Sequence, residues 1–410
     1  MTGYPSHVYL TKMIMRKIVK PIIFMTAIGL LASCSKMKDA VPGEPQEIKG
    51  QFSGFKTHRF EPTVINLTSF DSIEKKGFVN RNKQNSLTFL RDSVWTNGTG
   101  KTTFYETTDI PAVLPETRRL LFLGAILRGD KAIDVDNVLP EFISPVYRNP
   151  ITMYANFPTD SVFRTVLPSK SAENTYIRTA LAHGGTDQLQ SFTYEQSQFR
   201  RTEELKKSFG ANLNLGNILK VSYLDSLDNS KFKTIVRAEF TQENFSVAIE
   251  PPIEKPFLKE NFNMSVFNNI RPVIVSSVTY GRKGILIMES DSSYSAVQKT
   301  LNASLNLAAN MLGISSKDSL GAKFSAELKL RLTKEQKETI ASSRMKVYLI
   351  GPKGDAIVKA IVTGLPGFAE VLAASGGFTK DSPGEILYYT LNYLDNFGTF
   401  RNQFKINVAN

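Results

Sequence analysis

The chain has 410 residues, with 50 Lys or Arg against 38 Asp or Glu, so its net charge at neutral pH is +12. The basic residues are scattered and form no tract with interleaved aromatic residues, which argues against nucleic-acid binding. The excess positive charge is more consistent with attraction to anionic membrane surfaces. The single cysteine excludes a disulfide within the chain. A chain of this length can bury a large core and divides into subdomains.

The N-terminus has the pattern of a lipoprotein signal peptide. Four positive residues between positions 12 and 20 precede an apolar run at 21–31, which ends in Leu31-Ala32-Ser33-Cys34. We expect cleavage before Cys34 and lipidation of its thiol, so that the protein is exported to the outer membrane or cell surface, anchored there or released. The apolar run is too short to span a bilayer as a helix. Residues 34–59 are rich in Pro, Glu and Lys and are interpreted as a tether.

Short segments with strand character follow. Turn residues interrupt residues 60–168, so strands with loops are expected there. Helices are predicted at 171–183 and 194–209, and a strand at 245–249 ends at Pro251-Pro252. Residues 272–289 give the strongest strand signal, and Gly281 inside this run predicts a bend, a bulge or a close backbone approach. A strand at 345–350 stops at Gly351-Pro352, residues 357–372 are partly helical, and 386–397 form the final strand.

Two longer stretches alternate apolar and polar residues, which places their apolar side chains on one face of a strand. Each arm is about the ~9 to 11 residues that a tilted strand needs to cross a bilayer core. The apolar members of the first stretch are Phe209, Ala211, Leu213, Leu215, Leu219, Val221 and Tyr223, then, after a turn, Phe232, Val236, Ala238 and Phe240. Those of the second are Leu301, Ala303, Leu305, Leu307, Ala309 and Met311, then Phe324, Ala326, Leu328, Leu330 and Leu332.

We interpret these stretches as two β-hairpins that insert into a membrane. Their polar faces carry Lys231, Lys233, Glu239, Lys329 and Arg331, which would line the pore or its rim. An ordinary antiparallel sheet with one face in water gives the same alternation and is the alternative interpretation.

The sequence does not favour an enzyme. Once Cys34 is lipidated, His58 and His183 cannot assemble a Cys/His pair or a His-rich metal site. The Asp134-Val135-Asp136-Asn137 segment lacks the Gly and the distal Glu of an EF-hand loop, and a turn is expected there. We expect no catalytic residues, no cofactor and no metal.

Residues 275–282, Val-Ser-Ser-Val-Thr-Tyr-Gly-Arg, resemble the central strand of the cholesterol-dependent, or thiol-activated, cytolysins, which carries a Val-Ala-Tyr-Gly-Arg run. Residues 123–127, 134–140, 245–248 and 378–396 resemble other segments of that family in the same order, so the resemblance spans about 120–410. Both alternating stretches lie where the family has its two transmembrane hairpins.

The resemblance implies an α+β, cytolysin/perforin-like fold, in which two amphipathic insertions flank a central bent antiparallel sheet. The insertions are helical in the water-soluble form and become hairpins in a large oligomeric barrel. Leu301, Leu305, Ala308 and Leu312 do lie at helical spacing. The resemblance also implies roles in strand alignment and oligomerisation for Tyr280, Gly281, Arg282, Gly351 and Gly354.

The expected organisation is a signal peptide at 1–33, the tether at 34–59 and the N-terminal part of the core at 60–195. The first hairpin region with its following strand takes 196–250, core sheet 251–295, the second hairpin region 296–343, and core sheet with a closing helix and final strand 344–410. The family's C-terminal membrane-binding domain, with its Trp-rich segment, is not expected, because the only Trp is Trp95.

The sequence therefore does not support cholesterol recognition. The expected partners are membrane lipid and other subunits, either copies of this chain or a longer cytolysin-like protein that delivers it to a target membrane. A surface-anchored binding or adhesion lipoprotein that keeps the fold without inserting is the alternative function.

Overall fold

The computed structural model describes residues 52–67, 88–112, 114–133, 140–160, 163–184, 191–199, 205, 232–253, 255–309, 326–327, 329–351, 365, 368 and 378–409. All of them belong to the second of the two units of the chain, Pro45–Asn410. The expected signal peptide, Cys34 and most of the tether lie outside the described residues, as does most of the first alternating stretch.

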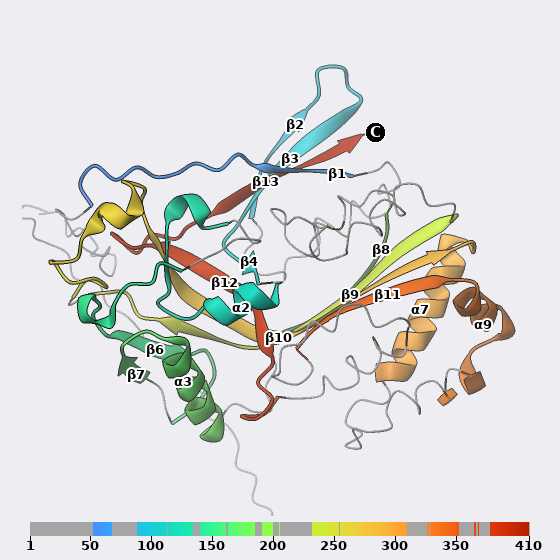
Figure 1. The fold of residues 1–410 in the computed structure, drawn as a ribbon. Helices are drawn as coiled ribbons and strands as arrows, with labels where there is room; N and C mark the ends of the chain where they lie inside the picture. The colour runs from blue at the N-terminus through green and yellow to red at the C-terminus, as the bar shows by residue number, and fades with distance from the viewer. Residues whose placement is uncertain are drawn as a thin grey trace, which may run out of the picture. The chain divides into compact units, whose positions relative to one another are not determined.

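Two sheets dominate the described residues (Figure 1). The nine-stranded sheet contains β4 (Ile110–Pro111), β5 (Ile126–Leu127), β6 (Ile151–Ala155), β7 (Phe163–Val166), β8 (Ser191–Gln198), β9 (Thr234–Ile249), β10 (Val273–Ser290), β11 (Arg344–Ile350) and β12 (Glu385–Tyr393). The four-stranded sheet has the order β1 (Thr63–Leu67), β13 (Asn402–Ala409), β3 (Gly100–Thr107), β2 (Thr88–Val94). The α-helices are α2 (Pro115–Leu120), α3 (Lys170–Ala182), α7 (Tyr294–Ala309) and α9 (Lys334–Ala341), and short 3-10 helices occur at Gly129–Lys131, Pro145–Tyr147 and Met264–Phe267.

The antiparallel pair of β9 and β10 organises the nine-stranded sheet. Its register runs from Ser277↔Ala248 to Ser290↔Thr234. On its other edge β10 pairs first with β12 and then with β11, while β9 pairs with β6 near its end and with β8 near its start. One end of this pair carries β12 and β6, with β4, β5 and β7, and the other end carries β11 and β8. The strands of one group do not pair with those of the other.

Alternation along these strands builds a separate core on each face, as a period of two requires. Val236, Ala238 and Phe240 of β9 lie in a buried cluster with Leu286 and Met288 of β10. Ile285 and Ile287 of β10 belong instead to the larger cluster, which includes residues of β12 and α3. Helix α7 covers the first cluster and α3 lies beside the other half of the sheet (Figure 1).

Most predicted strands are confirmed, and one predicted helix is wrong. The expected strands at 272–289, 345–350 and 386–397 correspond to β10, β11 and β12, and the helix at 171–183 corresponds to α3, which Ser169 caps through a bond from the Ala172 amide. Residues 194–198, expected to begin a helix, lie in β8, because every residue of β8 pairs with β9. Strand β13 was not predicted, since 386–397 was taken as the last strand.

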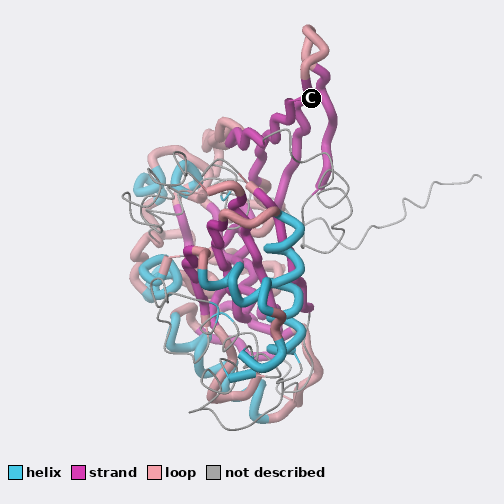
Figure 2. Tube along the Cα trace, turned by 90° about the vertical axis from the view of Figure 1, so that its right-hand side faces the viewer, coloured by secondary structure: helices cyan, strands magenta, loops and turns pink. Residues whose placement is uncertain are grey.

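The four-stranded sheet carries the β2–β3 hairpin, which lies beside the C-terminal strand β13 (Figure 2). Trp95 at its turn donates from Nε1 to Thr102 Oγ1 at 2.9 Å, and the Thr102 hydroxyl donates to Asn407 of β13 at 2.7 Å. Tyr105 stacks on Phe404 with ring centroids 5.6 Å apart. The side chains thus join the hairpin to β13 in addition to the backbone ladder.

Gly100 provides a test of this packing, because an added Cβ would lie 2.5 Å from the Val408 carbonyl oxygen and 2.7 Å from the Trp95 ring. Gly100→Ala is expected to lower the free energy of unfolding by about 1–3 kcal/mol, the usual cost of overpacking. Trp95, the only tryptophan, should show red-shifted fluorescence as it is displaced toward water. The exposed Thr96→Ala in the same turn is the control. Unchanged stability and emission in Gly100→Ala would contradict the packing described.

Candidate functional site

The outer partner of β10 changes at residues 280–283, which we call the strand-exchange point. Gly281 pairs with Glu385 of β12, and Lys283 pairs with Ile350 of β11. Register shifts occur between Thr279 and Tyr280 on the β12 side and between Tyr280 and Gly281 on the β9 side. The extra residues at these shifts are Asn244 of β9 and Leu387 of β12, so the bulges lie in the two partner strands, opposite Tyr280 and Gly281 of β10.

Three glycines make the exchange sterically feasible. A Cβ at Gly281 would lie 2.0 Å from the Gln242 carbonyl oxygen. Gly351, directly after β11, and Gly384, directly before β12, both have positive φ, at 78° and 95°. A Cβ on either would lie 2.8 Å or 2.6 Å from the Gly281 carbonyl oxygen. The end of one strand and the start of another thus approach the same carbonyl, which only residues without side chains permit.

Polar contacts from β9 and β10 fix the segment before β12. Asn244 donates from Nδ2 to the Pro383 carbonyl at 2.8 Å and accepts from Gln242 at 2.7 Å. Arg282, which is buried, donates to Ser382 Oγ at 3.2 Å. These contacts hold the turn that presents Gly384.

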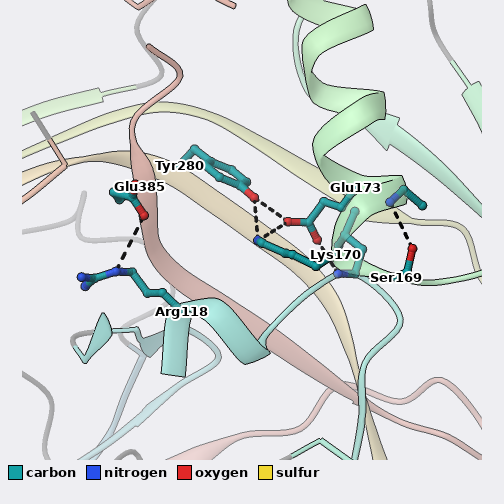
Figure 3. A network of polar contacts seen from close by, with 8 residues as sticks. Arg118, Ser169, Lys170, Glu173, Tyr280 and Glu385 are labelled. Atoms are coloured by element: carbon teal, nitrogen blue, oxygen red, sulfur yellow. Dashed lines mark hydrogen bonds and ion pairs between the residues drawn. The ribbon is translucent and has the colours of Figure 1, made fainter. Parts of the chain in front are cut away.

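The side chain of Tyr280 points toward the start of α3 (Figure 3). Its hydroxyl donates to Oε1 of Glu173, which is fully buried and also accepts from Lys170 Nζ at 2.8 Å. The second carboxylate oxygen accepts from the Leu123 amide at 2.5 Å. The Tyr280 ring stacks on Phe245 of β9 at 5.2 Å. Burial first, and then the charge of Glu173, raise the pKa of Tyr280 well above its usual value, so the hydroxyl keeps its proton.

Helix α7 covers the sheet on the opposite side of the exchange point from α3. Val297, Leu301 and Leu307 are buried against the sheet, whereas Asn302 and Asn306 are exposed. Thr300 and Ser304 are buried as well, so buried positions recur every three or four residues, which is the spacing of one helix face. Asn302 also accepts a hydrogen bond from Gln196 of β8. The same residues therefore show the period of a helix in this structure and the period of a strand in the sequence.

The sheet face away from α7 carries a buried ionic network. Arg237 of β9 places Nη2 3.3 Å from Glu195 Oε2 of β8 and Nε 3.8 Å from Glu239 Oε2. Glu239 Oε1 in turn lies 2.7 Å from Lys283 Nζ of β10. Burial lowers the pKa of Lys283, but the electrostatic interactions with Glu239 and Tyr388 and the hydrogen bond to Glu239 outweigh it, so this pKa lies above its ordinary value. Glu239 is buried in this structure, whereas an ordinary antiparallel sheet with one face in water would leave it solvated. Removing one member would leave another buried charge with fewer opposite charges around it, which is unfavourable.

The structure separates the predicted hairpin residues into three groups. Val236, Ala238 and Phe240 lie in β9 and Phe232 just before it, while Leu301, Ala303, Leu305, Leu307 and Ala309 lie in α7. Leu332 is buried, Leu330 is 78% exposed and Ala326 is exposed. The residues from Phe209 to Tyr223, together with Met311, Phe324, Leu328 and Gly354, lie outside the described residues.

Glu173 and Gly384 are among the residues of the site that were not identified from the sequence. Glu173 has no signal, since a carboxylate in an amphipathic helix is normally solvated and only the tertiary fold brings it to Tyr280. Gly384 follows Pro383, and a Pro-Gly pair is a turn signal that could have indicated its positive φ. Over the part of the chain that the structure describes, no cluster of His, Cys, Asp or Glu could hold a metal ion. In the same ranges no helix combines the length and apolarity needed to cross a membrane.

Comparison with known proteins identifies the architecture. Pneumolysin superposes with a TM-score of 0.56 and 18% identity, covering 87% of this chain and 72% of its own. Listeriolysin O gives 0.57 and 16%, covering 89% and 71%, and suilysin from Streptococcus suis gives 0.55 and 17%, covering 87% and 73%. Comparison with curated protein sequences gives no match. The fold is that of the cholesterol-dependent cytolysins.

The sequence profile of the thiol-activated cytolysins matches residues 99–404. The chain belongs to the thiol-activated cytolysin family. Cytolysins of this family are pore-forming toxins and not enzymes; they are secreted, oligomerise, and act on the membranes of target cells.

Gly384→Ala tests the geometry of the strand-exchange point. The added methyl group meets a backbone oxygen and the residue must keep a positive φ, so the free energy of unfolding should fall by about 1–3 kcal/mol. Chemical denaturation measures the change. Gly398→Ala is the matched control, because φ there is not positive and its added Cβ meets only the flexible Asn396 side chain. Equal losses in both variants would contradict a special role for Gly384.

Proposed function

We propose that the protein oligomerises on a membrane and inserts two β-hairpins per subunit into a large barrel. The observation that carries this proposal is the position of α7. Strand β10 ends at Ser290 and α7 begins at Tyr294, so extension of β10 would run directly into the alternating residues of the second hairpin. A helix that follows the strand and carries the strand period is suited to refolding from one form to the other.

The length of α7 is sufficient for such a crossing. The helix has 16 residues. In a β-strand each residue spans about 3.3 Å, and a tilted crossing of the ~30 Å hydrocarbon core takes about 9–11 residues. The face that alternates as Leu301, Ala303, Leu305, Leu307 and Ala309 would contact lipid, and Asn302, Ser304 and Asn306 would face the lumen. The first hairpin would extend β9 and β8 in the same way.

Oligomerisation follows from the backbone chemistry. A single hairpin in lipid leaves the N–H and C=O groups of its edges unpaired, so a membrane-spanning sheet has to close on itself. Among the described strands of this half of the sheet, β8 pairs with β9 alone and β11 with β10 alone. These edges are where neighbouring subunits would pair. The resemblance implies that the outer edge of β11 has to be freed for this pairing, and Gly351 at the end of β11, together with Gly354, would permit that change.

The resemblance implies a Gly-Gly pair after the strand whose edge is freed, whereas this chain has Gly351-Pro352-Lys353-Gly354 at that place. Proline cannot donate a backbone hydrogen bond and protects an edge from pairing.

We propose that the protein is an exported lipoprotein anchored through Cys34 and that a longer cytolysin-like protein delivers it to the target membrane. Recognition of cholesterol by this chain is not part of the proposal.

A cross-link between α7 and β8 tests whether α7 must leave the sheet. Asn302 of α7 accepts a hydrogen bond from Gln196 of β8, so cysteines at these positions lie within reach of a short thiol-specific cross-linker. In a chain with Cys34→Ser, joining Gln196→Cys to Asn302→Cys with a reducible cross-linker should abolish dye release from phosphatidylcholine–phosphatidylserine vesicles, and dithiothreitol should restore it. Release is measured with and without cholesterol, and with longer family members added.

The control pair is Thr152→Cys and Thr165→Cys, which joins β6 to β7 and should not affect release. These two residues are directly opposite and their hydroxyl oxygens lie 3.0 Å apart. If the cross-linked Gln196/Asn302 variant releases dye as fast as its reduced form, α7 does not have to leave the sheet. If the unmodified chain gives neither release nor ring-shaped oligomers with any lipid or partner, the proposed function is wrong.

A further inference from the structure

We propose that an exposed apolar face around Tyr147 and Phe262 rests on the lipid bilayer to which the protein is anchored, and that this contact keeps α7 away from that bilayer. The inference rests on the proposed anchoring through Cys34, and its experiment lets the two fail separately.

Backbone pairing fixes the place where the tether joins the fold. Lys56 forms an isolated parallel bridge with Ile270, with hydrogen bonds of 2.8 and 2.9 Å on either side. Because the bridge is parallel, the chain from Lys56 back to Phe52 runs toward the 3-10 helix Met264–Phe267, which precedes Ile270. The Phe52 and Phe55 rings contact each other with centroids 5.6 Å apart and pack against the larger core cluster. The first described residues therefore leave the fold beside this helix (Figure 1).

Arg271 reinforces this pairing. Its guanidinium donates to both carboxylate oxygens of Asp395, at 2.8 and 2.9 Å, and to the Thr57 hydroxyl at 3.2 Å. It also lies over the Tyr393 ring, 4.1 Å from the ring centroid. A bidentate pair of Arg and carboxylate fixes direction as well as distance. The end of the tether is thus held in one place on the fold.

Apolar side chains are exposed next to that place. The Tyr147 and Phe262 rings contact each other with centroids 5.7 Å apart, and Phe262 packs on the 3-10 helix, 6.0 Å from its buried phenyl ring. Residues near these two rings in the chain are exposed at 85% for Phe142, 61% for Val146 and 42% for Val266. Exposed apolar residues that gather in one place mark an interaction surface. We call these five residues the docking face.

The segments around the docking face carry more exposed cations than exposed acids. Over residues 52–61 and 255–271 the exposed cations are Lys56, Arg59, Lys255 and Lys259, and the exposed acids are Glu61 and Glu260. Apolar side chains at the level of the lipid headgroups, with cations beside them, are the combination that binds a protein to the surface of an anionic bilayer. The chemistry of this surface therefore fits lipid.

The tether brings this face to a bilayer. Phe52 is the eighteenth residue after Cys34, so the tether spans at most about 65 Å when fully extended. A lipid on Cys34 would hold the fold within that distance of the membrane, where even a weak contact is occupied because the local concentration is high. The occupant that the chain itself supplies is the anchoring bilayer.

Docking would also set the direction of β10. This strand starts at Val273, shortly after the bridge at Ile270, and ends at Ser290, shortly before α7 begins at Tyr294. Its 18 residues span up to about 60 Å. The docking face and the second hairpin region thus lie at opposite ends of the strand. A docked protein holds α7 away from the anchoring bilayer and leaves it available for a second membrane.

Tryptophan quenching by brominated lipid tests the docking. The chain without residues 1–33, which lie outside the unit that contains every described residue, is coupled through Cys34 to maleimide-bearing phosphatidylethanolamine. The vesicles contain phosphatidylcholine and phosphatidylglycerol, at a protein density that gives no dye release. Brominated phosphatidylcholine should lower the emission added by Phe142→Trp or Val146→Trp, above that of Trp95, about twofold, because a docked apolar face enters the interface by about 5–10 Å.

Two controls report on other surfaces of the fold. Phe89 of β2 is 55% exposed, and Asn306 is exposed on α7. The emission added by Phe89→Trp or by Asn306→Trp should not change with brominated lipid. Adding Val146→Ser and Val266→Ser to Phe142→Trp should reverse most of its quenching, which shows that the face docks and not the new tryptophan alone.

The outcomes separate docking, orientation and anchoring. Quenching at the docking face that does not exceed quenching in Phe89→Trp overturns the inference, and equal quenching in Asn306→Trp overturns the orientation. The intact mass of the exported protein decides the anchoring independently, because the coupling is chemical. A lipid on Cys34 without quenching overturns the inference and leaves the anchoring in place. Quenching in a protein that carries no lipid on Cys34 overturns the anchoring and supports a face that binds bilayers.

Discussion

The antiparallel pairing of β9 with β10 is the constraint on which the rest of the structure depends. Fourteen register pairs join the two strands from Ser277↔Ala248 to Ser290↔Thr234, and each shorter strand of the sheet is held, directly or through a neighbour, by one of them. Because both outer edges change partner along this pair, the sheet consists of two halves that share only the long strands. A change in one half can therefore occur while the other half keeps its pairing.

The strand-exchange point is where this division is made. Gly351 and Gly384 allow two backbone segments to approach the Gly281 carbonyl, and Gly281 itself approaches the Gln242 carbonyl. Tyr280 is stacked on Phe245 and bonded to Glu173. The glycines allow the backbones to pack closely at this point, and the buried contact between Tyr280 and Glu173 fixes the position of β10. The family to which the chain belongs acts on membranes. A junction of this kind suits a sheet in which one half keeps its strand pairing while the other half changes.

Much of this architecture could be predicted from the sequence because periodicity is a local signal. The apolar run of β10 and its internal Gly281 indicated both a central strand and its irregularity, and the helical spacing at Leu301 indicated the soluble form of α7. Residues 194–198 were misassigned because short mixed segments do not separate the two periods, and pairing with β9 decides the outcome. The contact between Glu173 and Tyr280 could not be predicted, since 107 residues separate its partners in the chain and no local pattern marks which carboxylate is buried.

The central claim is that residues 301–309 exchange a helical for a strand period on a membrane. The most direct measurement attaches an environment-sensitive fluorophore to single cysteines at each position from Leu301 to Ala309, with Cys34→Ser, and records emission in water and on vesicles that support pore formation. The account predicts that emission on vesicles alternates, with blue shifts at the odd positions 301, 303, 305, 307 and 309 and not at the even ones. Emission that keeps a period of three to four residues, or that does not change on vesicles that are being lysed, would contradict it.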